Sequence, residues 1–229
     1  MSIVEIFYES VKLILSLDKL LYEIIFLSLK VSFLALFLSS FFALFLAYIL
    51  ALKKSYFRNL IIVISNSLMG IPPVVVGLIV YFLLVRDGPL GALELLYTPS
   101  AMIIAQMIII FPIVLSLSYE IFSQNWKLFK DHFRSFNIPF FGIMIILIRH
   151  SYIFITTVFL SAFGRAISEV GAVMIVGGNI EHYTRVMTTA ITLETRMGNL
   201  EYAMALGLIL IFITMIINTT VYLFNFKYR

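Results

Sequence analysis

GRAISEVGAVMIVGGNI, residues 164–180, follows a long apolar segment and combines charged residues with glycines. Arg165 and Glu169 stand four positions apart, so their side chains can pair on one face of a helix. Ionised groups beside a membrane span are costly and need such a partner. The positions best able to leave helical geometry are Gly171, Gly177, Gly178 and Asn179. Non-helical backbone at membrane depth persists only where protein buries it or where it lines an aqueous cavity. The stretch therefore predicts a re-entrant or gate-like segment.

The composition points to a membrane protein. Of the 229 residues, 62% are hydrophobic and 12% are charged, whereas a soluble domain has about 25% charged residues. The formal charge of +4 does not indicate nucleic-acid binding, because Lys and Arg collect in the cytoplasmic loops of membrane proteins. The chain contains no cysteine, which excludes disulfides and thiolate chemistry. We expect an all-α integral membrane protein without a separate soluble domain.

Long apolar segments predict about five transmembrane helices. They cover residues 31–52, 60–85, 95–119, 142–164 and 202–226. Before them, residues 1–21 repeat apolar side chains at helical spacing. This pattern predicts an amphipathic interfacial helix that acts as an anchor or a partner contact, unless it forms a sixth span. The basic residues that mark the cytoplasmic side are Lys53, Lys54, Arg58, Lys127, Lys130, Arg134, Arg149, Lys227 and Arg229. This bias places the N-terminus outside and the C-terminus inside.

An interruption divides the second predicted span. It consists of a polar triplet and a proline pair: Ser65, Asn66, Ser67, Pro72 and Pro73. Proline removes a backbone donor and clashes with the preceding turn, so we expect a kinked or locally opened helix. Two interpretations stay open. In one, the polar groups face a polar path. In the other, the kink serves packing and Gly77 allows close contact between helices.

Residues 123–141 form the most polar part of the predicted cytoplasmic side. The polar positions are Trp126, Lys127, Lys130, Asp131, His132, Arg134 and Asn137, and the apolar ones are Leu128, Phe129, Phe133 and Phe136. Pro139 ends any helix here, because the residue before a proline avoids helical geometry. The pattern predicts a short amphipathic helix, which either docks on a partner protein or forms a plain interfacial loop.

The chain shows no set of residues for catalysis or metal binding. No lysine follows a glycine, so a P-loop is absent. The three histidines are far apart and lack metal-ligand spacing, and no nucleophile–base set is visible. We therefore predict no catalytic residues, no metal and no cofactor on this chain. Active transport would need an energy source on another subunit.

Four stretches together resemble the membrane subunit of an ABC importer of the molybdate and tungstate group. They are GIPPVVVG at residues 70–77, GPLG at residues 88–91, residues 165–180 and residues 184–206. The last stretch is most similar to the tungstate-type permeases. The resemblance covers roughly residues 22–225. It implies a MetI-like permease domain over residues 22–229, which follows the N-terminal helix of residues 1–21.

The same resemblance implies an assembly in the cytoplasmic (inner) membrane. It contains a homodimer of this subunit, two cytoplasmic ATPase subunits that bind ATP and Mg, and an extracytoplasmic substrate-binding protein. In this family a coupling helix docks on the ATPase, and the positions carried over to it are Trp126, Lys127, Lys130, Phe133, Arg134 and Asn137. The family's loop glycine falls on Asn137 and its Leu-Pro pair falls near Arg149 and His150. Asn tolerates left-handed backbone, whereas the missing Leu-Pro leaves the end of the loop open.

Substrate and gating roles follow as expectations. An oxyanion in transit needs hydrogen-bond donors but no tight site, and the candidates are Ser65, Asn66, Ser67, Thr188, Thr189 and Thr192. The candidate gate residues are Pro72, Pro73, Arg165, Glu169, Gly171, Gly177, Gly178 and Asn179. Arg165 and Glu169 are expected to brace the gate as an ion pair rather than bind substrate. The alternatives are a permease for molybdate, sulfate or another solute, and a secondary transporter driven by an ion gradient, which would favour internal repeats.

Overall fold

The computed structural model describes residues 3–53 and 56–227, and the side chains up to residue 223. Lys54 and Arg229, which were counted as cytoplasmic charges, lie outside these ranges. Every regular element within them is helical. In chain order these elements are α1 (Ile3–Leu15), α2 (Lys19–Leu52), α3 (Tyr56–Leu68), α4 (Pro73–Leu84), the 3-10 turn η1 (Gly91–Leu93), α5 (Pro99–Ser135), α6 (Phe140–His150), α7 (Tyr152–Ile167), α8 (Gly171–Gly177), α9 (Met187–Met197) and α10 (Leu200–Lys227).

Three of the described helices are long and apolar enough to cross a membrane. These are α2, α5 and the part of α10 from Leu200 to Leu223. Two further pairs qualify when each is taken together: α3 with α4, which meet at 107°, and α6 with α7, which meet at 76°. Counting each bent pair as one span gives up to five, which confirms the all-α membrane fold.

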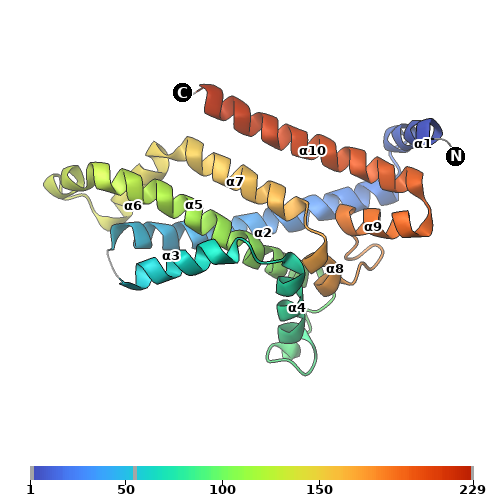
Figure 1. Cartoon of the computed structure of the whole chain (residues 1–229), viewed down its shortest axis with the longest axis horizontal. Coiled ribbons are helices and arrows are strands. Elements are labelled where there is room, and N and C mark those ends of the chain that lie inside the picture. The colour runs from blue at the N-terminus through green and yellow to red at the C-terminus, as the bar shows by residue number, and fades with distance from the viewer. Residues whose placement is uncertain (1–2, 54–55, 228–229) are drawn as a thin grey trace.

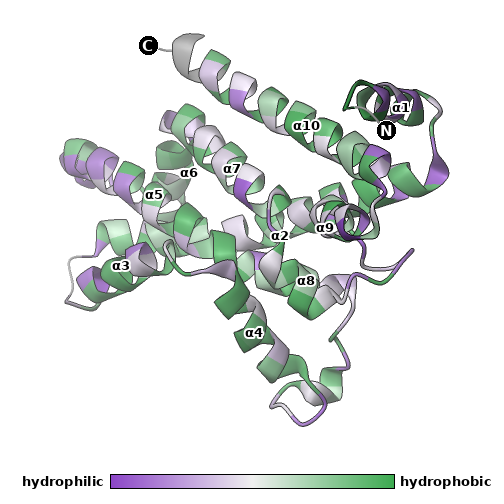
Figure 2. Cartoon of the chain, turned by 45° about the vertical axis from the view of Figure 1, so that its right-hand side comes forward, coloured by the Kyte–Doolittle hydropathy of each residue, from purple (hydrophilic) through white to green (hydrophobic). Residues whose placement is uncertain are grey.

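The centre of the molecule is the contact between α2 and α5, which lie side by side (Figure 1). Small residues make this contact close, because Ala43 and Ala47 of α2 and Ala101 and Ala105 of α5 are fully buried. Large apolar side chains point outward instead, and Phe37 of α2 is 62% exposed. Figure 2 shows hydrophobic residues along the long helices and hydrophilic ones gathered toward the end of α5.

The second predicted span breaks more sharply than a kink. Residues 60–85 were predicted as one interrupted helix, whereas α3 ends at Leu68 and α4 starts afresh at Pro73. Pro72 is extended and Pro73 occupies the first turn of α4, where its missing N–H costs nothing. The 107° bend makes α4 project away from the bundle (Figure 1).

The third and fourth predicted spans also differ from expectation. The short separate helix predicted within residues 123–141 is wrong, because α5 runs without a break from Pro99 to Ser135. No glycine or proline lies between Pro112 and Pro139 to end it earlier. The fourth span, predicted over residues 142–164, is instead broken at Ser151 between α6 and α7.

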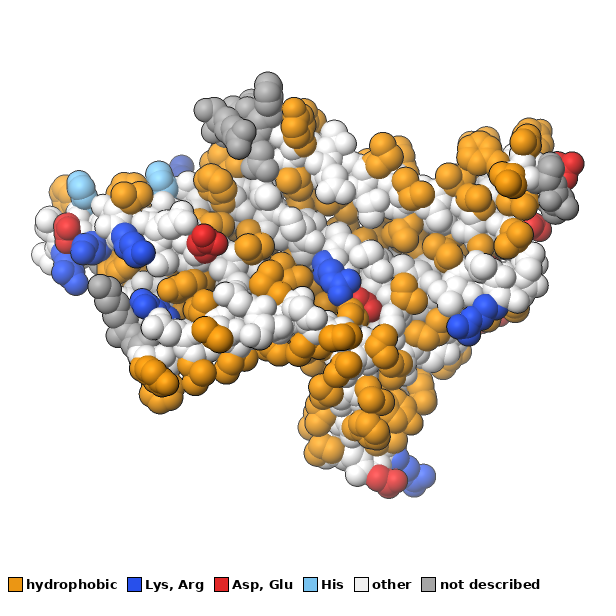
Figure 3. Space-filling view, in the orientation of Figure 1, with side chains coloured by type: hydrophobic (Ala, Val, Ile, Leu, Met, Phe, Trp, Pro, Cys, Tyr) orange, Lys and Arg blue, Asp and Glu red, His pale blue; other side chains and the backbone are white. Residues whose placement is uncertain are grey.

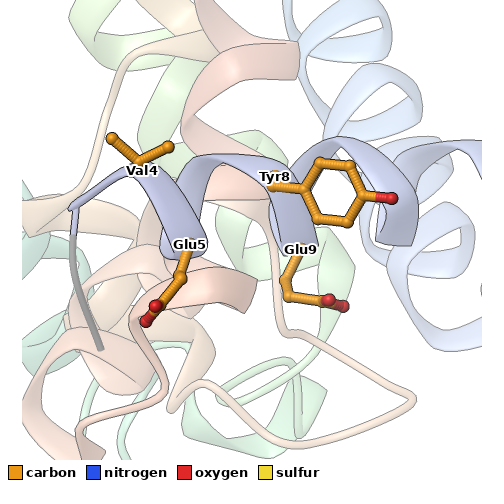
Figure 4. Close-up of a pocket in the computed structure, with 4 residues that line it drawn as sticks. All are labelled: Val4, Glu5, Tyr8 and Glu9. Atoms are coloured by element: carbon orange, nitrogen blue, oxygen red, sulfur yellow. The ribbon is translucent and has the colours of Figure 1, made fainter.

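The N-terminal helix packs on the start of α10. The hydroxyl of Ser10 donates to the carbonyl of Glu201 at 2.8 Å, and the backbone turns between α1 and α2 at Leu17, whose φ is 56°. α2 starts at Lys19, inside the segment predicted as residues 1–21. A pocket of about 410 Å³ on α1 is lined by Val4, Glu5, Tyr8 and Glu9 (Figure 4). This mixture of apolar and acidic side chains fits an interfacial amphipathic helix. The proposed domain boundary stays a prediction.

Candidate functional site

The predicted ion pair forms between the end of α7 and the start of α8. Arg165 Nη1 lies 3.3 Å from Glu169 Oε2, and the Glu169 side chain is 3% exposed. Glu169 Oε1 also accepts a hydrogen bond from the backbone N–H of Ala172 at 3.3 Å. The hydroxyl of Thr188 donates to the carbonyl of Glu169 at 2.7 Å. One buried carboxylate residue therefore holds α7, α8 and α9 together.

Sequence reasoning missed a second polar residue at this junction. Gln106 of α5 is 4% exposed, and its Nε2 donates to the carbonyl of Ala166 at 3.0 Å. This bond ties α5 to the last turn of α7, where the carbonyl of Ala166 also accepts from the backbone N–H of Glu169 at 3.2 Å. The signal was available, since Gln106 is the single side-chain amide within the third predicted span.

Glycines bring α8 against α4. A Cβ added at Gly77 would lie 2.6 Å from the Cα of Ala172, and one added at Gly171 would lie 2.5 Å from Cγ2 of Val74. Neither helix can approach this closely with a larger residue at these positions. The prediction that Gly77 gives close helix contact is therefore confirmed. The helix that leaves the bundle after Pro72 is fastened by this contact to the predicted gate segment.

The turn after α8 is compact and internally bonded. Gly178 has a φ of +69° and Asn179 has a φ of 52°, so this part leaves helical geometry as predicted. Gly177 instead stays in the last turn of α8. The hydroxyl of Thr184 donates to the carbonyl of Gly177 at 2.6 Å and accepts from the N–H of Ile180 at 2.9 Å. This turn is closed by its own hydrogen bonds.

The candidate oxyanion ligands do not converge within one chain. Figure 1 shows α3, which carries Ser65, Asn66 and Ser67, far from α9, which carries the three threonines. Ser65 donates to the carbonyl of Pro112 at 3.2 Å and accepts from the hydroxyl of Ser116 at 2.9 Å, which links α3 to α5. Ser67 donates to the carbonyl of Val63 at 2.9 Å. Asn66 and Ser67 are exposed.

The threonines of α9 also bond to backbone. Thr188 and Thr189 are buried; Thr188 bonds to Glu169, and the hydroxyl of Thr189 donates to the carbonyl of Val186 at 3.1 Å. Thr192 donates to the carbonyl of Thr188 at 3.0 Å. These threonine hydroxyls therefore stabilise the fold. Whether any of the six residues also lines a path stays a prediction.

The predicted docking segment is the end of α5 and the turn after it. A hollow of about 360 Å³ is lined by Trp126, Phe133, Arg134, Asn137, Ile138 and Ile143. The rings of Trp126 and Phe133 stack with centroids 6.0 Å apart, while Lys127 and Lys130 are exposed. Asn137 has a φ of 48°, a left-handed backbone geometry that Asn tolerates better than most residues with a side chain. The hollow combines an aromatic wall with basic side chains around it.

Comparisons with known proteins show the family to which the chain belongs. The family model described as binding-protein-dependent transport system inner membrane component matches residues 41–229. The chain is 40% identical over 222 residues to a tungstate uptake system permease protein TupB from Peptoclostridium acidaminophilum, which covers 96% of each chain. It is 39% identical over 203 residues to a probable anion ABC transporter permease protein from Haloferax volcanii, which covers 86% of this chain and 88% of the relative.

A third relative is a tungstate uptake system permease protein TupB from Campylobacter jejuni. It is 38% identical over 164 residues, which is 70% of this chain and 67% of the relative. The family match and the first relative each span most of the chain, including every element of the candidate gate and the docking segment. The chain therefore belongs to the family of inner membrane components of binding-protein-dependent transport systems.

Proposed function

We propose that this chain is the permease subunit of an ATP-driven importer that moves tungstate across the cytoplasmic membrane. The observation that carries the proposal is the 40% identity to a tungstate uptake permease over 96% of both chains. The relative described only as a probable anion permease supports a second candidate, a broader oxyanion permease that also accepts molybdate or sulfate. A polar path with neutral donors suits either, since a transported dianion must be bound weakly enough to leave.

The energy source is a pair of ATPase subunits that bind ATP and Mg and dock on the hollow at the end of α5. The absence of a P-loop in the chain supports a separate ATPase. Trp126 and the largely buried Phe133 form an apolar wall of the hollow, and the exposed Arg134 lies beside it. A partner's apolar side chain could pack against this wall while Arg134 pairs with an acidic group, and Trp and Arg are among the residues that dominate binding energy at protein interfaces. An extracytoplasmic binding protein delivers the substrate at the opposite end.

The end of the molecule with the hollow is the cytoplasmic one. Lys and Arg side chains gather at this end in Figure 3, where α5 ends and α6 begins. Lys127, Lys130 and Arg134 contribute to the group and are exposed. Basic residues favour the cytoplasmic side of membrane proteins. This orientation places the turn after α8 and the start of α10 outside.

A second copy of the chain covers α4. This helix leaves the bundle at 107° with Val75, Leu78 and Phe82 exposed at 44%, 46% and 60%. In the mechanism, closure of the ATPase dimer shifts the docking segments, and the two permeases rock between inward-open and outward-open forms. The Arg165–Glu169 pair braces the gate between α7 and α8 during this movement.

The decisive experiment is reconstitution. The chain is purified with its ATPase, placed in vesicles with its binding protein, and tested for uptake of tungstate, molybdate and sulfate. We expect tungstate uptake that requires ATP hydrolysis. Uptake of molybdate or sulfate at a similar rate would favour the broader oxyanion permease. Uptake without nucleotide by the chain alone would refute the proposal and favour a gradient-driven transporter.

A further inference from the structure

A polar contact holds the break between α6 and α7. Ser151, at this break, is 1% exposed, and its hydroxyl accepts a hydrogen bond from Asn125 Nδ2 at 2.6 Å. One helical turn further along α5, the rings of Phe129 and His150 pack edge to face, with their centroids 4.9 Å apart. Two consecutive residues of the break are thus held by two residues on the same face of α5.

These contacts close a loop of helices around the docking hollow. The end of α5, the turn at Asn137 and α6 form its sides, and the Asn125–Ser151 bond joins residues 26 positions apart. The start of α6 is fixed as well, because the hydroxyl of Tyr48 in α2 donates to the carbonyl of Phe140. With both ends of α6 held, these contacts connect the walls of the hollow to the start of α7.

We propose that Asn125 and Ser151 are positioning residues that pass the movement of the docking segment into α7. The proposal rests on the proposed function, because it needs an ATPase docked at the hollow. α7 has 16 residues, so it transmits a displacement over about 24 Å, much of the thickness of a bilayer. Figure 1 shows α7 running from α6 to the neighbourhood of α8, where Arg165 pairs with Glu169.

A hydrogen bond suits this task better than apolar packing alone. It constrains direction as well as distance, so the angle between α5 and α7 is kept when the end of α5 moves. Removing one partner also leaves the other without its bond in a buried place. The sequence gives no hint of the pair, since Asn125 and Ser151 are 26 positions apart and no local pattern links them.

The test measures tungstate transported per ATP hydrolysed by the complex in vesicles. Asn125→Leu keeps the size of the side chain and removes the amide. We expect the ratio to fall at least about fivefold, the lower end of typical coupling effects, while assembly and ATP hydrolysis are kept. Asn125→Asp should retain most of the wild-type ratio, because its carboxylate can accept from the Ser151 hydroxyl.

Gln124→Leu is the matched control. Gln124 is the neighbouring amide, exposed and bonded to Glu120 at 3.4 Å, so its loss should leave the ratio unchanged. A normal ratio in Asn125→Leu would overturn the proposal. Loss of assembly in that variant would also overturn it, because the pair would then be purely structural.

A second test uses the lack of cysteine in the chain. In the double variant Asn125→Cys and Ser151→Cys, oxidation joins the two positions and a reductant separates them. The reduced form lacks the Asn125–Ser151 hydrogen bond, so it should transport less tungstate per ATP than the wild type, and oxidation should restore the ratio by joining the two positions covalently. Inhibition by oxidation that a reductant reverses would show that the contact must open, which contradicts the proposal. A wild-type complex that takes up no tungstate with ATP would instead contradict the proposed function.

Discussion

At Gly178 the backbone geometry and a neighbouring ring both exclude a side chain. Its φ is +69°, and a Cβ would lie 2.8 Å from the ring of Tyr97. Gly177 is helical, and the nearest atoms to its Cβ belong to the flexible side chain of Met102, at 3.0 Å. The two adjacent glycines are equivalent in the sequence, so only the structure separates their roles.

Gly178→Ala should destabilise the protein more than Gly177→Ala. The left-handed geometry alone costs a residue with a Cβ about 1–2 kcal/mol, and contact with Tyr97 adds to this. Thermal unfolding of the two purified variants in detergent measures the difference. Equal melting temperatures would mean that the turn rearranges freely, and the closed turn described above would then not be a rigid part of the gate.

The Arg165–Glu169 pair allows a test between bracing and substrate binding. Arg165→Met leaves the buried Glu169 carboxylate without its counter-ion. The expected destabilisation is smaller than the about 3–5 kcal/mol of a fully buried pair, because the Arg165 side chain is 38% exposed. Adding Glu169→Gln removes the unpaired charge and should recover both stability and tungstate uptake. A double variant that is stable but inactive would show that Arg165 contacts the substrate.

Residue-level prediction from the sequence succeeded where the partners are close in the chain. The spacing of Arg165 and Glu169 predicted their contact, because four positions on a helix bring two side chains together. Gln106 and Asn125 bond to groups on other helices, 60 and 26 positions away. No local sequence pattern predicts a contact between residues so far apart in the chain, so these contacts could be identified only from the three-dimensional structure.

Among the helices, α4 and α8 depend most on each other's backbone. A Cβ at Gly77 would meet the backbone of Ala172 at 2.6 Å, and backbone cannot move aside as a flexible side chain does. Gly77→Ala should therefore separate the two helices and abolish most tungstate uptake. Gly207→Ala in α10 is the control, because nothing lies within 4 Å of its Cβ and alanine favours a helix by about 1 kcal/mol. Normal uptake in Gly77→Ala would show that the gate does not need this contact.

The helix breaks show which parts of the architecture can be predicted from local sequence. Pro72 and Pro73 predicted the break between α3 and α4, because proline cannot continue a helix. The size of the bend depends on the packing of Gly77 against α8, which no local pattern contains. The break at Ser151 has no proline or glycine next to it, and contacts with Asn125 and Phe129 hold it. α5 continues to Ser135, past the predicted end at residue 119, because its polar last turns still favour a helix when they pack on α6.

At the scale of the whole molecule, α4 has too much exposed apolar surface for a helix outside the bundle. Val75, Leu78 and Phe82 are exposed at 44%, 46% and 60%, and Figure 3 shows hydrophobic side chains covering the projecting part. Lipid could cover such a surface, as it would cover Phe37 of α2, which is 62% exposed. A second copy of the chain differs from lipid in one respect, since it brings protein side chains within reach of α4.

Single cysteines can therefore identify what covers α4. In the cysteine-free chain, Leu78→Cys should form a crosslinked dimer in native membranes with a short thiol-reactive reagent, if the proposed second copy packs against this face. Phe37→Cys, more exposed but on the surface of α2, should stay monomeric under the same treatment. Electrophoresis without reductant measures both. Crosslinking at Phe37→Cys but not at Leu78→Cys would move the interface to α2, and α4 would then lie against lipid as a membrane anchor of the gate.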